Sequence, residues 1–402
     1  MAEEIQLSVL FYNLGRWSGI IGFTCLSLLI FSGDTARFFD RFLGLDRIIK
    51  FQRKFSLFTA FFVFLHPIFF IISNRTFARY LIPDFAIFPL ALGAVSLYIF
   101  IVVLISSLIY KRISYNIWQY IHILTYLLFF FGLYHAINMG SFIIFSSVKI
   151  LYGFLFLAII IGIAYRTWYK IKERFKEKFY VEKIIKETND TFSLFLKTKR
   201  KVVFKAGQFF FLRINKNNLY ARHPFTTSSS PNEKLLRFTI KNTGRFTKTA
   251  FCLQRGEEVI LDGPFGIFTL KDRKKDIVFI AGGVGITPFM SMIRNNLYSR
   301  EKQNILLLYG SKTKEDIIFK DELNKIEEKW LKTVYILSKE MSPLSWCERG
   351  YINKPLIEKY VKNPKGSLFY ICGPEIMKES SVKILLDLGV KKRDIFIEDF
   401  FW

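Results

Sequence analysis

The stretch IHILTYLLFFFGLYH (residues 121–135) places two histidines, His122 and His135, inside a long apolar run. The chain contains only four histidines, and a third, His66, lies in a similar run, FFVFLHPIFFII (61–72). Ionisable side chains inside apolar membrane spans are costly and usually mark a functional site. These two stretches therefore predict a membrane-embedded helical unit in which the histidines have a chemical role.

The composition divides the 402-residue chain into an apolar half and a mixed half. Long runs of Phe, Ile and Leu dominate residues 1–166, whereas residues 167–402 have the mixed pattern of a globular protein. The net charge of +25 raises the question of a nucleic-acid partner, but no basic stripe with a recognition motif supports one. Basic cytosolic loops and anionic nucleotide ligands account for the charge better. The four cysteines form no CxxC pattern, which indicates a reduced, cytosolic environment.

Five apolar stretches are long enough to cross a bilayer, which needs about 20 residues. They lie near residues 9–31, 54–73, 87–110, 117–137 and 145–166. Glu3 and Glu4 stand where a cleaved signal peptide would carry positive charge, so the first stretch is expected to stay in the protein. The alternate connections contain 12 Lys and Arg residues against 2, which predicts an outside N-terminus and a cytosolic C-terminal half.

This topology gives each histidine a depth in the membrane. The spans near 54–73 and 117–137 both run from inside to outside, so His122 lies near the cytosolic face. His66 and His135 lie deeper, at matching depth toward the outer face. Two such imidazoles can hold one haem iron between them. The alternative is that each is a core histidine, hydrogen-bonded to a neighbouring helix.

The second half of the chain shows two kinds of strand pattern. FSLFLK, VVFKAGQFFFLRI and LLRFTIK, separated by polar turns, predict an antiparallel barrel that ends near residue 270. The following segment, IVFIAGGVGITPFMSMI, predicts a buried strand, a glycine turn and a helix; NILLLYG, TVYILS and SLFYICGP are further strands. Helices are expected around 317–330, 353–361 and 374–389, and this alternation predicts a parallel, doubly wound sheet. A pyrophosphate can approach the turn AGGVGITP (281–288), although a purely structural tight turn is the alternative.

Four motifs in this order resemble the dehydrogenase of the NADPH oxidase and ferric reductase family. They are HPFT in ARHPFTTSS (221–229), KxxGxxT in KNTGRFTK (241–248), AGGxGITPF and CGP (372–374). The membrane half resembles the same family in LGRWSGIIG (14–22), GLDRIIKFQRKF (44–55) and the histidine-bearing spans, and compact bacterial NADPH oxidases are the most similar members. The family usually has six spans, and this chain is expected to lack the first.

The resemblance implies three parts in an integral protein of the bacterial inner or plasma membrane. These are an α-helical transmembrane haem-binding bundle (1–170), an antiparallel FAD-binding barrel (178–272) and an α/β doubly wound NAD(P)H-binding domain (273–402). The last two domains together resemble ferredoxin-NADP reductase. It also implies the cofactors FAD, haem b and NADPH, with NADH as the alternative. Besides membrane lipid, the only partner implied is the electron acceptor, dioxygen or a ferric complex; no obligate protein partner is expected.

The resemblance also implies roles for individual residues. FAD would be held by His223, Pro224, Phe225, Thr226, Lys241, Gly244 and Thr247, with Phe225 against the isoalloxazine. The nicotinamide nucleotide would be held by Gly282, Gly283, Gly285, Thr287, Pro288, Gly373 and Pro374, and the 2′-phosphate by Ser311 and Lys312. Cys372 and Glu398 would line the hydride-transfer site, and Phe400 would cover the flavin. Arg16 would lie by the oxygen site, unless it is an interfacial anchor.

The chain departs from the family at the inner haem. His66 and His135 complete an outer site, but the position fourteen residues before His66, where the family has a histidine, is Gln52. His122 would then face an amide, which is a poor iron ligand. We expect a retained but labile, partly high-spin inner haem. The expected activity is electron transfer from NADPH across the membrane to dioxygen, giving superoxide, with ferric or cupric reduction or electron donation to a quinone or periplasmic partner as alternatives.

Overall fold

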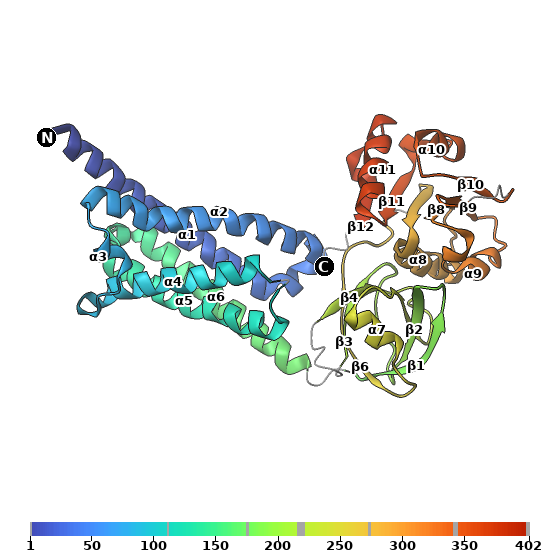
Figure 1. The fold of residues 1–402 in the computed structure, drawn as a ribbon, viewed down its shortest axis with the longest axis horizontal. Helices are drawn as coiled ribbons and strands as arrows, with labels where there is room; N and C mark the ends of the chain where they lie inside the picture. The colour runs from blue at the N-terminus through green and yellow to red at the C-terminus, as the bar shows by residue number, and fades with distance from the viewer. Residues whose placement is uncertain are drawn as a thin grey trace. The chain divides into compact units, whose positions relative to one another are not determined.

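The computed structural model describes residues 2–110, 112–173, 177–214, 222–271, 275–340 and 345–398. The chain forms two compact units, residues 1–176 and 177–402. The first consists of helices and the second of an antiparallel barrel followed by a parallel sheet with helices (Figure 1).

The first unit is built from long apolar helices. They are α1 (Ala2–Leu43), α2 (Leu45–Asn74), α4 (Phe88–Leu108), α5 (Tyr115–Met139) and α6 (Ser146–Glu173), with the short α3 (Ala78–Leu81) after α2. In the described part of the chain, five helices are long and apolar enough to cross a membrane. The expected number of spans is confirmed, and the protein is a multi-pass membrane protein.

The connection between α1 and α2 is much shorter than the sequence suggested. Residues 32–51, which lie between the first two apolar stretches, are mostly helical, because α1 continues to Leu43 and α2 begins at Leu45. Gly44 turns the chain with φ of +81°, a conformation that glycine adopts without steric cost. The Asp40 carboxylate then accepts a hydrogen bond from the Leu45 N–H at 2.7 Å. This local capping removes the need for a longer loop.

Aromatic and aliphatic side chains hold the helices together. Phe23 of α1 stacks on Phe129 of α5 with ring centres 5.4 Å apart, and Tyr152 of α6 packs edge-on against Phe23. Phe129 and Leu155 are buried, while many other apolar side chains of these helices are exposed. Apolar side chains on the outside suit a surface that faces lipid rather than water.

The barrel is formed by six antiparallel strands. They are β1 (Phe179–Lys186), β2 (Thr191–Lys197), β3 (Phe209–Arg213), β4 (His223–Thr226), β5 (Leu236–Lys241) and β6 (Glu258–Phe265), in the order β4-β3-β6-β1-β2-β5. A bridge between Thr227 and Phe238 joins the two end strands. The short helix α7 (Arg245–Phe251) follows β5. The antiparallel barrel predicted from the strand pattern is confirmed.

The last part is a six-stranded parallel sheet in the order β10-β9-β8-β7-β11-β12. Its strands are β7 (Ile277–Gly282), β8 (Ile305–Ser311), β9 (Leu331–Leu337), β10 (Cys347–Arg349), β11 (Leu368–Cys372) and β12 (Ile395–Glu398). Its helices are α8 (Thr287–Tyr298), α9 (Lys320–Asn324), α10 (Lys354–Tyr360) and α11 (Glu375–Asp387). The chain order reverses between β7 and β11, which is the topological switch point where such sheets bind ligands.

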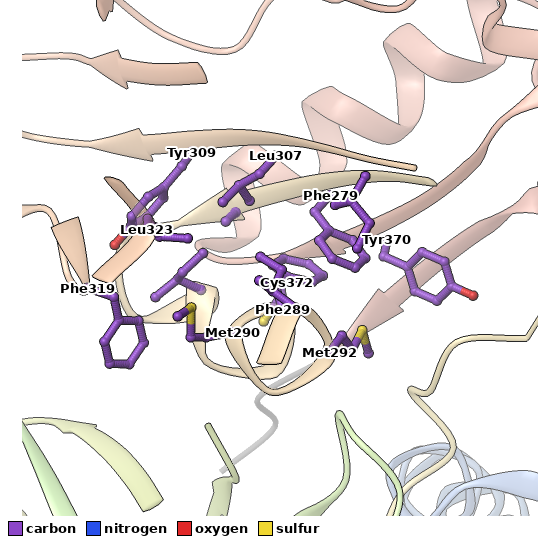
Figure 2. Close-up of a cluster of buried hydrophobic side chains, with 14 of the residues drawn as sticks. Phe279, Phe289, Met290, Met292, Leu307, Tyr309, Phe319, Leu323, Tyr370 and Cys372 are labelled. Carbon is purple, nitrogen blue, oxygen red and sulfur yellow. The ribbon is translucent and has the colours of Figure 1, made fainter. Parts of the chain in front are cut away.

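A buried cluster fixes the first βα unit of this sheet. Figure 2 shows Phe279 of β7 lying against Phe289 of α8, and their rings stack with centres 4.5 Å apart. Tyr370 of β11 meets Phe279 edge-on. The helix expected over 317–330 is much shorter, because only Lys320–Asn324 is helical and the chain turns into β9 after it.

Candidate functional site

The glycine turn after β7 packs directly against the end of β11. Ala281 and Cys372 are partners in the parallel ladder, so the two motifs AGGVG and CGP meet at one edge of the sheet. A Cβ at Gly285 would lie 2.3 Å from the Cys372 carbonyl oxygen, and one at Gly373 would lie 3.0 Å from the Gly282 Cα. No side chain fits at either position. The sequence had indicated the two motifs separately, and the fold brings them together.

Helix α8 begins at this turn. Gly283 has φ of +52°, and the Thr287 hydroxyl donates a hydrogen bond to the Val284 carbonyl. Pro288 stands in the first helical turn, where its missing N–H is not needed. The N-terminus of a twelve-residue helix at the switch point suits an anionic pyrophosphate.

The residues expected at the hydride-transfer site meet at the same edge of the sheet. Cys372 is buried at the end of β11, and its partner in the ladder with β12 is Glu398. The structure therefore places these two residues side by side at the carboxyl edge. Phe400, which we expected to cover the flavin, lies outside the described residues.

Ser311 ends strand β8 and Lys312 follows it, on the same carboxyl edge. Their carbonyl oxygens accept hydrogen bonds from the backbone N–H groups of Ser338 and Lys339, at 3.0 and 2.8 Å. Ser311 is buried, whereas Lys312 is exposed. A fixed backbone with an exposed cation is a suitable arrangement for reading a phosphate on a bound nucleotide.

The HPFT segment forms an aromatic stack with Phe246, a residue that we did not predict to take part in the site. His223 of β4 lies over Phe246 of α7 with ring centres 4.0 Å apart, and Phe225 lies parallel to Phe246 at 5.9 Å. Burial lowers the pKa of His223, so its ring is neutral at neutral pH. The Thr226 hydroxyl is buried and has no hydrogen-bond partner among the described residues. Phe246 lies between Gly244 and Thr247, which we predicted to contact FAD. An aromatic residue between them was the signal that could have identified it.

Thr247 organises the turn between β5 and α7. Its hydroxyl oxygen accepts hydrogen bonds from the N–H groups of Thr243 and Gly244 at 3.0 and 2.9 Å. Lys241, which precedes the turn, forms an ion pair with Asp190 at 3.0 Å. The turn is therefore held in one shape by a side chain that we expected to contact FAD.

A partly buried ion cluster joins the barrel to the nucleotide domain. The Arg294 guanidinium of α8 bonds both carboxylate oxygens of Glu322 at 2.6 Å, and Arg237 of β5 bonds the same carboxylate at 3.0 Å. Burial would raise the pKa of Glu322, but the hydrogen bonds and charge of Arg294, with the charge of Arg237, lower it. Both guanidinium groups lie over the ring of Phe319, which has φ of +61°. No sequence motif indicated this cluster, since its members come from distant segments.

In the helical unit, His66 of α2 faces His135 of α5. Their ring centres are 6.1 Å apart and their planes are inclined by 82°. The Nδ1 atom of His66 is hydrogen-bonded to the carbonyl of Gly15 at 2.8 Å, and that of His135 to the carbonyl of Pro89 at 2.9 Å. Since a carbonyl oxygen only accepts, each Nδ1 carries the proton and each Nε2 has a lone pair for a metal. We expected the two histidines to lie at the same depth, and in the structure their rings lie next to each other.

The two residues expected at an inner haem have other contacts. His122 is hydrogen-bonded through Nδ1 to the carbonyl of Trp118 at 2.9 Å and through Nε2 to the hydroxyl of Ser107 at 3.2 Å. The Gln52 amide donates to the Ser32 hydroxyl at 2.9 Å. An inner haem site made by these two side chains stays a prediction.

Arg16 lies in the N-terminal half of α1. Its guanidinium carbon is 3.6 Å from the centre of the Phe142 ring, and its Nη1 donates to the Asn13 side chain at 3.2 Å. These contacts hold the cation against an aromatic ring, and its expected role beside an oxygen site stays a prediction.

A polar cluster that we did not predict joins three of the long helices. The Asp34 carboxylate of α1 accepts hydrogen bonds from the Tyr126 hydroxyl at 2.7 Å and from Arg166 at 3.0 Å. Arg166 also donates to the Tyr126 oxygen at 3.1 Å. The Asp34 side chain is 2% exposed and that of Arg166 34%, so the carboxylate end of the ion pair is shielded from water. An aspartate at the end of an apolar span was the available signal.

Three families match consecutive parts of this chain. Residues 18–133 match the ferric reductase like transmembrane component, residues 177–269 an FAD-binding domain and residues 279–383 an oxidoreductase NAD-binding domain. The chain has the domain architecture of ferric reductase and NADPH oxidase-like proteins. The resemblance found in the motifs is thereby confirmed. The protein is a membrane-bound oxidoreductase with a ferric reductase-like transmembrane domain and FAD- and NAD(P)H-binding domains, and its architecture is that of an electron-transfer protein.

The curated relatives match only part of this chain. One subunit of the Na(+)-translocating NADH-quinone reductase of Haemophilus influenzae (strain 86-028NP) is 31% identical over 164 residues, which are 39% of this chain and 40% of the relative. The corresponding protein of Neisseria meningitidis serogroup B (strain ATCC BAA-335 / MC58) is 32% identical over the same length. The chain thus spans about two-fifths of the length of these curated relatives.

Solved structures match the fold of a little over half of the chain. The Amycolatopsis cytochrome P450 reductase GcoB has a TM-score of 0.51 at 25% identity, covering 56% of this chain and 69% of GcoB. The FAD/NAD-binding domain of a nitric oxide dioxygenase from Vibrio cholerae O1 biovar El Tor has a TM-score of 0.51 at 22% identity, covering 56% of this chain and 98% of that domain. The soluble half therefore has the ferredoxin-NADP reductase-like fold.

Proposed function

We propose that this protein transfers electrons from cytosolic NAD(P)H, through FAD and a b-type haem, to an acceptor on the opposite side of the membrane. The observation that carries the proposal is the facing pair His66 and His135 inside an apolar bundle. Apolar spans rarely contain ionisable side chains without a function, and the other half of the chain has the flavin and nucleotide domains that supply electrons.

The histidine pair fits a haem iron. Two metal–nitrogen bonds of about 2 Å each, with about 1 Å from each nitrogen to its ring centre, separate two ring centres by about 6 Å. The observed separation is 6.1 Å. A metal-bound histidine usually donates its other ring N–H to a carbonyl or carboxylate, as both Nδ1 atoms do here. His66 and His135 would therefore hold the iron, and a bound haem would supply one-electron chemistry within the apolar layer.

The barrel fits a flavin. Thr226 offers a buried hydroxyl without a partner in the described part of the chain, and the stack of His223, Phe246 and Phe225 offers an apolar wall beside it. The turn at Gly244, which Thr247 holds in one shape, lies among the basic residues Lys241, Arg245 and Lys248 of KNTGRFTK. These residues would bind and orient FAD, whose ring passes on hydride equivalents as single electrons when bound.

The edge of the parallel sheet fits a nicotinamide nucleotide. The backbone of the glycine turn is open at Gly283, where an added Cβ would meet no described atom within 4 Å, so a pyrophosphate could approach there. Cys372 and Glu398 would line the nicotinamide end, and Lys312 would meet a 2′-phosphate. A lysine at this position supports NADPH, because an acidic residue is usual where a free ribose diol is bound.

The proposed acceptor is dioxygen, which would be reduced to superoxide, and the proposed orientation follows the bias of Lys and Arg in the connections. Ferric or cupric reduction uses the same machinery. A quinone is a further candidate, supported by the similarity over 164 residues to a subunit of Na(+)-translocating NADH-quinone reductases.

The experiment supplies NADPH and FAD to the purified protein and follows cytochrome c reduction with and without superoxide dismutase. Reduction of cytochrome c that superoxide dismutase suppresses supports the oxidase. Reduction of a ferric chelate or a soluble quinone that dismutase does not suppress supports the corresponding reductase. An absorption spectrum without haem bands would refute the haem relay. Phe225→Ala is the matched variant: FAD binding should weaken while the haem spectrum is unchanged, since the two sites lie in different units.

A further inference from the structure

We propose that Gly19 and Gly93 are positioning residues for the two facing imidazoles, and that each is required because the histidine ring occupies the place of its side chain. The inference rests on the haem ligation proposed above. It goes further by assigning a role to two residues on helices that do not themselves carry the ligands.

Gly19 lies on α1, opposite His66 of α2. A Cβ built on Gly19 would lie 2.6 Å from His66 Nδ1 and 2.7 Å from its Cε1. Ordinary contacts between carbon atoms are about 3.5–4.0 Å, so a methyl group there would force the ring to retreat by about 1 Å. The same ring bonds the carbonyl of Gly15, four residues earlier on α1.

Gly93 repeats this arrangement on α4, opposite His135 of α5. Its Cβ would lie 2.6 Å from His135 Nδ1 and 2.8 Å from its Cε1. The ring bonds the carbonyl of Pro89, again four residues before the glycine. The pattern of carbonyl, three residues and glycine therefore occurs on both sides of the site, on two helices that are far apart in the sequence.

The repetition has a simple geometric cause. In a helix the carbonyl of residue i accepts the N–H of residue i+4, and its second lone pair is free to accept from a neighbouring side chain. A ring that reaches this carbonyl from the side must pass over residue i+4. Glycine at that position admits the ring, and any larger residue would break either the hydrogen bond or the alignment of Nε2 with the iron.

The test uses the purified full-length protein and the variants Gly19→Ala and Gly93→Ala. The readouts are haem per FAD and the low-spin fraction in absorption and EPR spectra, neither of which depends on turnover. The matched control is Gly33→Ala, also on α1, where an added Cβ meets no described atom within 4 Å. We expect each of the two variants to lose most of the low-spin signal and to bind haem about tenfold or more weakly. Losses of this size follow when other groups that orient a metal ligand are changed. The spectrum and haem content of Gly33→Ala should be unchanged.

Wild-type spectra in either site variant would overturn the inference, and so would an equal loss in Gly33→Ala. If Gly19→Ala does not accumulate in cells, the double variant Gly19→Ala/His66→Ala is the deciding experiment. If it accumulates as well as His66→Ala alone, the defect of Gly19→Ala comes from the clash with the His66 ring. If the double variant does not accumulate either, the clash is excluded as the cause. Absence of haem from the wild-type protein would instead remove the proposed function on which the inference rests. The two failures are thus distinguishable.

Discussion

Replacing Thr247 with valine removes a hydroxyl while nearly preserving the shape of the side chain. Thr247 is 9% exposed, and its oxygen accepts the N–H groups of Thr243 and Gly244 at 3.0 and 2.9 Å. In the variant these two donors lose their acceptor, and the turn between β5 and α7 loses the contact that fixes it. The turn is the part of the barrel that we propose to hold the FAD pyrophosphate.

The size of the effect follows from these two hydrogen bonds. Each contributes about 0.5–1.5 kcal/mol net, so their loss costs about 1–3 kcal/mol of turn stability. If FAD binds only the ordered turn, the whole cost appears in the binding free energy. We therefore expect FAD to bind about 5- to 150-fold more weakly.

The assay is titration of FAD into the flavin-free protein, followed by quenching of flavin fluorescence. Thr249→Val is the matched control, because Thr249 lies on the same helix, is half-buried and donates only to the Arg245 carbonyl of its own turn among the described residues, at 3.1 Å. The haem spectrum should not change in either variant. Equal FAD affinity in Thr247→Val and Thr249→Val would refute the reasoning.

Three further predictions concern separate parts of the molecule. Lys312→Glu should raise KM for NADPH far more than for NADH, because it sets a carboxylate against the 2′-phosphate; equal effects in steady-state kinetics would remove Lys312 from that site. Arg294→Met should destabilise the soluble half by roughly 1–3 kcal/mol, because it breaks an ion pair with Glu322 that is only partly buried, the Glu322 side chain being 38% exposed. The midpoint of thermal FAD release should fall accordingly, whereas Arg255→Met, at an exposed arginine, should change that midpoint little; similar midpoints for the two variants would contradict this. Gln52→His should convert any high-spin haem fraction to low-spin in EPR spectra, and an unchanged spectrum would show that residue 52 is not at an iron.

Local features of the sequence were enough to predict much of the fold. A membrane span needs only length and apolar composition, so five spans could be read directly, and an alternating strand pattern predicted the barrel. The glycine turn at 281–288 and the CGP motif were recognisable because their backbone requirements are local. The apolar pattern did not reveal that the first two helices continue through residues 32–51, because one positive-φ residue, Gly44, and one capping carboxylate, Asp40, close the connection within a single residue.

The tertiary structure decided which groups meet. His66 and its carbonyl partner are 51 residues apart, and His135 and its partner are 46 apart, so neither hydrogen bond can be inferred from spacing. The same holds for the stack on Phe246 and for the carboxylate of Glu322, which joins arginines from the barrel and from α8. The sequence determined which residue types were available and on which elements. Only the packing of those elements determined that two glycines leave room for two imidazoles, because close approach is a property of two surfaces and not of either segment alone.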